Sequence, residues 1–120
     1  MELAVIEQEY QDIVNHICIA ENETPAKLRL KHLKSCGRYH TKTHSISVPF
    51  WAGSRGIEYA WWYVIHESIH AIGYGGHGKA FKAKETYWLN QFGLNPLYAK
   101  AYVKQLLSLN GEVLYIRPKY

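Results

Sequence analysis

The sequence predicts an α+β domain in which an N-terminal helix and a small sheet precede a central helix and C-terminal helices. Three observations indicate this class. Apolar residues near the N-terminus recur at helical spacing. Polar and apolar residues then alternate within the segment from 27 to 48, and a strongly apolar helical stripe begins at Ile57. With 120 residues and 48% hydrophobic content, we expect residues 1–120 to form a single domain with a modest core.

The first helix is expected over about residues 2–21. One of its faces carries apolar side chains at helical spacing, namely Leu3, Ile6, Tyr10, Ile13, Val14 and Ile17. The segment Asn22-Glu23-Thr24-Pro25 should separate this helix from the next element, because proline fixes its own φ and biases the preceding residue away from the helical region.

Two strands are expected next. From Lys27 to Leu33 polar and apolar residues alternate as in a half-buried strand, although propensity alone also permits a short helix. The stretch from Arg38 to Pro49 is rich in Tyr, Thr, Ser, Ile and Val, and it predicts a second strand, or a hairpin with a strand near 44–48. Residues 49–56 are expected to form a loop. The sheet is expected to be antiparallel or mixed.

The segment from Ile57 to Ile72 is expected to be the central helix, with an apolar stripe suited to packing on a sheet. Its end is indicated by Gly73 and the three glycines that come after it, since glycine is unfavourable inside a helix and tolerates positive φ beyond one. Two further helices are expected over 79–92 and 95–109, and a strand over 112–117.

The central helix carries the motif His66-Glu67-Ser68-Ile69-His70. Histidines four residues apart project from the same helix face, one turn apart, so both can bind one ion. Glu67 is placed where its carboxylate can reach a metal-bound water, which is the general-base role in zinc peptidases. The motif therefore predicts a Zn²⁺ site with His66 and His70 as ligands and Glu67 as the catalytic residue.

A catalytic zinc usually has three protein ligands and a fourth position for water. His77 follows the motif behind Gly73, Gly75 and Gly76, and this flexible stretch would let the chain reverse and bring a third imidazole to the ion. His77 is the preferred third ligand. Glu85 is the rival, because some zinc peptidases take a glutamate from the helix after the motif; the alternative for Glu85 is a solvated helix residue.

From about Leu28 to Phe92 the chain resembles the SprT-like and YgjP-like family of small zinc metallopeptidases. The segments that carry the resemblance are Lys34-Ser35-Cys36-Gly37, His44-Ser45-Ile46-Ser47-Val48-Pro49, the helix from Trp62 to His70, and His77-Gly78-Lys79-Ala80-Phe81. The resemblance implies a minimal zincin-type peptidase domain and favours His77 over Glu85. The chain departs from the family at Ser68, where a larger apolar residue is usual. The spacing of the third histidine does not fit the metzincin class.

We therefore expect a zinc-dependent endopeptidase that hydrolyses peptide bonds through a zinc-bound water activated by Glu67 and has protein or peptide substrates. Two alternatives stay open, a zinc hydrolase of non-protein amides and a non-catalytic zinc-stabilised module that binds nucleic acid. The net charge of +4 and a cluster of basic residues, Lys27, Arg29, Lys31, Lys34 and Arg38, permit weak nucleic-acid association, although a solvated basic face is the preferred interpretation of the cluster.

The sequence indicates a cytoplasmic, intracellular protein with no membrane association. It has only two cysteines, Cys18 and Cys36, which are expected to be buried thiols, and the acidic N-terminal segment is unlike a signal peptide. An oxyanion formed during hydrolysis usually needs a donor beyond zinc. The nearby candidates, among which the sequence does not choose, are Tyr39, His40, His44, Tyr63 and Tyr74.

Overall fold

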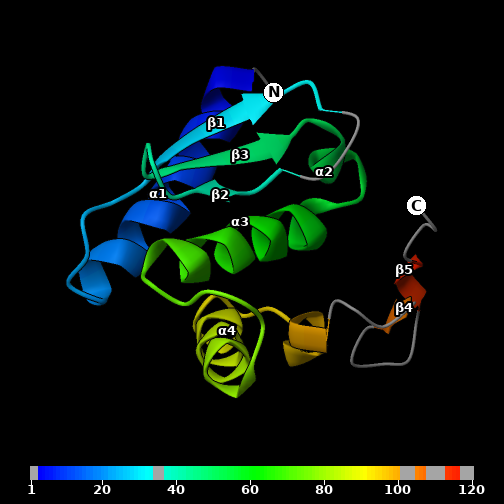
Figure 1. The fold of residues 1–120 in the computed structure, drawn as a ribbon. Helices are drawn as coiled ribbons and strands as arrows, with labels where there is room; N and C mark the ends of the chain where they lie inside the picture. Colours follow the sequence, from blue (N-terminus) through cyan, green and yellow to red (C-terminus); the bar gives the residue numbers. More distant parts are fainter. Residues whose placement is uncertain (1–2, 34–36, 101–104, 108–112, 117–120) are drawn as a thin grey trace.

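A computed structural model of the chain describes residues 3–33, 37–100, 105–107 and 113–116. It confirms the α+β class, with an N-terminal helix, a small mixed sheet and several helices (Figure 1). In chain order the elements are α1 (Leu3–Ala20), β1 (Lys27–Lys31), β2 (Tyr39–His40), β3 (Ser45–Pro49), α2 (Trp51–Ser54), α3 (Ile57–Ala71), α4 (Lys79–Gln91), the 3-10 helix η1 (Pro96–Lys100), β4 (Gln105–Leu107) and β5 (Val113–Ile116).

The main sheet has the strand order β1-β3-β2. β1 runs parallel to β3, with Leu28 opposite Ile46, and β2 runs antiparallel to β3, with Tyr39 opposite Ile46. Leu28 of β1 is fully buried, as the alternation in β1 predicts, and Ile46 and Val48 of β3 are fully buried as well. The expected strands and hairpin are therefore confirmed, and the sheet is mixed.

Side chains of α1 cover the outer edge of β1. Gln11 accepts a hydrogen bond from the backbone N–H of Leu28 at 2.7 Å and donates one to the carbonyl of Ala26 at 2.8 Å. One turn earlier, Glu7 accepts from the N–H of Leu30 at 2.9 Å. These contacts occupy backbone groups along one edge of the sheet. An exposed strand edge would otherwise be open to pairing with other chains.

Helix α3 lies between the three-stranded sheet and α4 (Figure 1). It is buried along most of its length, as expected for a helix that packs on neighbours on more than one side. The helix starts after Gly56, which has a φ of 106°, and stops before Gly73, which has a φ of 107°. Both conformations lie in the left-handed region that favours glycine, so these two residues set the length of the helix.

Glu21, at the end of α1, joins this helix to α4. Its carboxylate accepts a hydrogen bond from Lys84 Nζ at 3.0 Å and another from the indole N–H of Trp88 at 3.0 Å. The predicted extents of α1, α3 and α4 agree with the structure to within two residues.

Two sequence expectations for the connecting segments are wrong. The expected loop over 49–56 contains the four-residue helix α2. The helix expected over 95–109 is replaced by η1 and by strand β4, which pairs antiparallel with β5. Helical propensity in this segment is overridden by pairing with a strand later in the chain. The strand expected over 112–117 agrees with β5, whereas residues 112 and 117 themselves, like Lys34 and Cys36, lie outside the described residues.

Candidate metal centre

Helix α3 places His66 and His70 on the same face, one turn apart. Their ring centroids are 5.3 Å apart, and the His66 side chain is buried while that of His70 is half-buried. Four residues correspond to just over one helical turn, so this proximity follows from the helix itself. The helix thus supplies two imidazoles on a rigid element.

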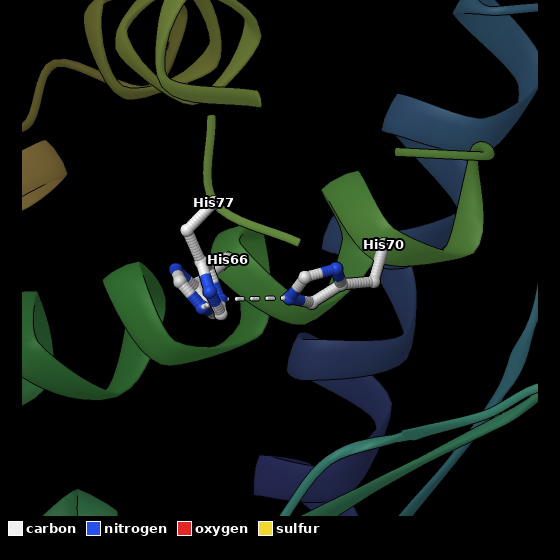
Figure 2. Close-up of side chains that lie close together, drawn as sticks. All are labelled: His66, His70 and His77. Carbon is white, nitrogen blue, oxygen red and sulfur yellow. Dashed lines mark hydrogen bonds between the residues drawn. The ribbon is translucent and has the colours of Figure 1, made fainter. Parts of the chain in front are cut away.

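The glycine-rich loop after α3 brings His77 to the same place. Beyond Gly73 the chain turns back, with Gly76 at a φ of 63°, and α4 begins after Gly78. His77 Nε2 lies 3.2 Å from His66 Nε2 and 3.2 Å from His70 Nε2. Figure 2 shows the three imidazoles directed toward one another. Within the part of the chain that the structure describes, these three residues form the group that could hold a metal ion.

A backbone carbonyl fixes the orientation of the His70 ring. Nδ1 of His70 lies 2.7 Å from the carbonyl oxygen of Tyr74 in the glycine-rich loop. Because a carbonyl oxygen only accepts, Nδ1 carries the proton, and in neutral imidazole Nε2 then keeps its lone pair. The loop therefore delivers one ligand, His77, and orients another.

The lowered pKa values of His70 and His77 also favour binding of a metal cation. Burial lowers the pKa of His70, as does His66 nearby, against the opposing effects of the Tyr74 carbonyl and Glu85. Burial also lowers the pKa of His77, and His66 and His70 lower it further. Neutral imidazole is the form that binds metal ions. Nitrogen lone pairs that point at one another repel unless a proton or a cation lies between them, so the arrangement fits a metal.

The spacing of the nitrogens agrees with this interpretation. Two nitrogen ligands at about 2.0–2.1 Å from a tetrahedral zinc ion lie about 3.3 Å from each other. The two separations from His77 Nε2 are both 3.2 Å. The donor set and its dimensions therefore fit a first-row transition metal, and imidazole ligands suit zinc, copper, iron and nickel.

Phe81 forms an apolar floor under the three histidines. Its ring is 1% exposed, and its centroid lies 4.9 Å from that of His66, 4.6 Å from His70 and 5.0 Å from His77. Phe81 is in the first turn of α4, four residues after His77. The beginning of α4 thus packs directly against the ligand rings.

Glu67 is buried on α3 and faces strand β2. Its Oε1 accepts a hydrogen bond from the backbone N–H of Tyr39 at 3.0 Å, and the residue is 7% exposed. Burial raises the pKa of the Glu67 carboxyl to about 7, although His66 and the Tyr39 N–H act in the opposite direction. A carboxyl group with such a pKa can both take up and release a proton near neutral pH.

Glu85 differs from the sequence expectation. It is 1% exposed, so its interpretation as a solvated residue is wrong. Nor does it belong to the group that could hold a metal, because its Oε2 lies 2.5 Å from His66 Nδ1, on the far side of that ring from Nε2. The missed signal is periodicity, since Glu85 lies on the buried stripe of α4, which contains Phe81, Glu85, Trp88 and Leu89.

Four of the five candidate oxyanion donors are hydrogen-bonded elsewhere. The hydroxyl of Tyr63 donates to the carbonyl of Gly37 at 3.0 Å. Tyr39 and His44 bond to each other at 2.7 Å. His40 Nε2 lies 2.9 Å from Ser47 Oγ. The fifth, Tyr74, contributes its carbonyl to His70, and its ring lies near Lys84 Nζ. These contacts hold β2, β3 and the glycine-rich loop in place.

The remaining candidates lie on other parts of the chain. Cys18 is fully buried, as expected, and burial raises the pKa of its thiol. The side chains of Lys27, Arg29, Lys31 and Arg38 are exposed, and Arg29 lies 3.8 Å from Glu7.

Among the described helices, none has both the length and the apolar character required to cross a membrane. Comparison of the chain with protein-family models, curated proteins and solved structures found no match.

Proposed function

We propose that this protein is a zinc-dependent peptidase in which His66, His70 and His77 hold the metal and Glu67 is the general base. The observation that carries the proposal is the convergence of three imidazole nitrogens, with His77 Nε2 at 3.2 Å from each of the other two, beside a helix that also bears a buried carboxylate. Three histidines are a ligand set of catalytic zinc sites, which supports zinc over the other metals that imidazole binds.

When bound, zinc supplies a Lewis acid and lowers the pKa of a coordinated water to about 7. Glu67 takes up the proton released by the attacking water and later donates it to the leaving amine. Its pKa of about 7 suits both steps. The hydrogen bond from Tyr39 N–H holds Oε1 and so fixes the direction of the carboxylate during this exchange. Protein or peptide substrates are proposed because amide hydrolysis is the reaction that this combination of groups serves.

The Glu67→Gln variant tests the mechanism, because glutamine keeps the shape of the side chain but cannot carry the proton. We expect it to retain zinc and to lose hydrolysis of a denatured protein substrate by at least about 100-fold, the lower range for a general base. Glu58→Gln is the matched control, since Glu58 is an exposed carboxylate on the same helix. Full activity of Glu67→Gln would refute the mechanism. A parallel panel of small amides separates a peptidase from a hydrolase of non-protein substrates.

The His77→Ala variant tests the ligand set independently of activity. Metal analysis of the purified chain is expected to give one zinc for the wild type and clear loss of zinc in the variant. Unchanged zinc content would exclude His77 as the third ligand.

A second candidate function is nucleic-acid binding, favoured by the exposed basic side chains Lys27, Arg29 and Lys31 on β1. Such binding would weaken as salt rises and would survive the Glu67→Gln change. A chain that binds DNA in this way, contains zinc and shows no hydrolysis would favour this alternative.

A further inference from the structure

The carboxylate of Glu85 is buried between α3 and α4 and contacts the back of a ligand ring. Its Oε2 lies 2.5 Å from His66 Nδ1 and accepts a hydrogen bond from the indole N–H of Trp62 at 3.3 Å. Both partners belong to α3, one turn apart, whereas Glu85 comes from α4. At 1% exposure, the carboxylate has these two donors in place of water.

The contact between Glu85 and His66 determines which nitrogen of His66 carries a proton. An ionised carboxylate only accepts hydrogen bonds, so His66 Nδ1 must be the donor. In the neutral ring Nε2 then has a free lone pair, and this lone pair is on the side that faces His77 Nε2, 3.2 Å away. The charge on Glu85 also makes the imidazole a stronger donor of electrons to a cation.

The same helix supports the histidines in a second way. Phe81 lies one turn before Glu85 on the buried stripe of α4 and packs against all three ligand rings. One face of α4 therefore provides both an apolar floor and a charged hydrogen-bond acceptor behind the cluster. A buried carboxylate on such a face is costly unless it serves a partner, and the partner here is His66.

We propose that Glu85 is a positioning residue of the metal centre, which holds the Nδ1 proton of His66 and thereby directs its Nε2 lone pair at the metal position. The inference rests on the metal site of the proposed function and is independent of peptidase activity. Partners that orient metal-bound histidines typically contribute 10- to 100-fold to metal affinity. Glutamine can still accept the Nδ1 hydrogen bond, but it removes the negative charge that strengthens this bond and the electron donation of the imidazole, so Glu85→Gln should weaken zinc binding by about 10- to 100-fold.

The experiment compares zinc affinities by competition with a chromogenic chelator in the wild type, Glu85→Gln and Glu21→Gln. Glu21 is a matched control, because its carboxylate also accepts from a tryptophan indole N–H and from a second donor, and it also joins α4 to another helix. A purely structural role for Glu85 predicts equal zinc affinities in the two variants. A positioning role predicts the loss in Glu85→Gln alone.

A second measurement decides the matter even if Glu85→Gln fails to fold. Nitrogen-15 NMR of the wild-type chain without metal should show the His66 proton on Nδ1, and a proton on Nε2 alone would overturn the inference. Wild-type affinity in a folded Glu85→Gln variant would overturn it as well, while leaving the proposed function intact. A wild-type chain that binds zinc but hydrolyses no peptide refutes only the proposed function. One that binds no zinc refutes both.

Discussion

Replacing Glu67 with glutamine should stabilise the fold above neutral pH, although removing a buried hydrogen-bonded group usually does the reverse. Glu67 is 7% exposed, and burial raises its pKa from 4.5 to about 7. Glutamine has the same shape and can still accept the hydrogen bond from Tyr39 N–H, but it carries no charge. The variant therefore isolates the cost of ionising this side chain inside the protein.

The size of the effect comes from the linkage between protonation and folding. A carboxyl group with a raised pKa in the folded state favours folding at low pH, so its contribution is fully present below about pH 4.5 and is lost as the pH rises through about 7. A tenfold change in an equilibrium corresponds to about 1.4 kcal/mol. Ionised Glu67 should therefore lower the free energy of unfolding by about 3 kcal/mol at about pH 8, and Glu67→Gln should recover that amount.

Urea denaturation at about pH 4 and at about pH 8 measures the difference. A chelator must be present, because bound metal adds a pH-dependent stabilisation of its own. Glu58→Gln controls for the loss of one negative charge on α3 and should show no comparable gain at the higher pH. If Glu67→Gln and the wild type have the same unfolding free energy at both pH values, the reasoning about Glu67 is wrong.

Two further substitutions test the surroundings of the cluster. Phe81→Ala should weaken metal binding and lower the free energy of unfolding by about 3–5 kcal/mol, because its ring packs against the three histidines. Tyr87→Ala, on the exposed side of α4, should change stability by at most about 0.5 kcal/mol in the same denaturation assay, and equal effects would contradict the packing argument. Gly37→Ala should reduce hydrolysis but not zinc content, because the added methyl group would overlap a carbonyl oxygen of β3 and displace the β2 N–H bound by Glu67. Gly75→Ala, which has open space around it, should leave both measurements unchanged, and loss of zinc from the Gly37 variant would argue against this separation.

The sequence predicts the longer elements of this fold well, for a physical reason. Helix α1 buries one periodic face, and helix α3 is apolar and buried along most of its length, so both helices are visible in the chain. Helix α2 has only four residues, Trp51–Ser54, which is too short for a helical period to emerge. The helix predicted over 95–109 is wrong for a different reason. Strand β4 depends on pairing with β5, and local propensity does not reflect contacts with a distant strand.

In the candidate metal centre, too, features set by local spacing can be predicted, whereas features that depend on distant contacts cannot. The spacing of His66 and His70 leads to their proximity because the helix between them is regular. The approach of His77 also depends on how the glycine-rich loop folds, which the sequence indicates only through its glycines. The hydrogen bond between Glu67 and Tyr39 joins residues from a helix and a strand, so no local pattern predicts it. The burial of Glu85 could have been predicted from its place on the apolar stripe of α4, where a carboxylate requires a buried partner.

The glycine-rich loop also makes the three histidines unequal. His66 and His70 are fixed relative to each other by α3, whereas exposed His77 reaches them through a short tether. Such a tether presents its ligand at an effective concentration that depends only weakly on the tether's length. A protease that nicked this loop would leave both helix histidines in place, yet His77 would no longer be joined to α3 by a short covalent path. The position of His77 would then depend on the packing of α4, whose Phe81 contacts the same three rings.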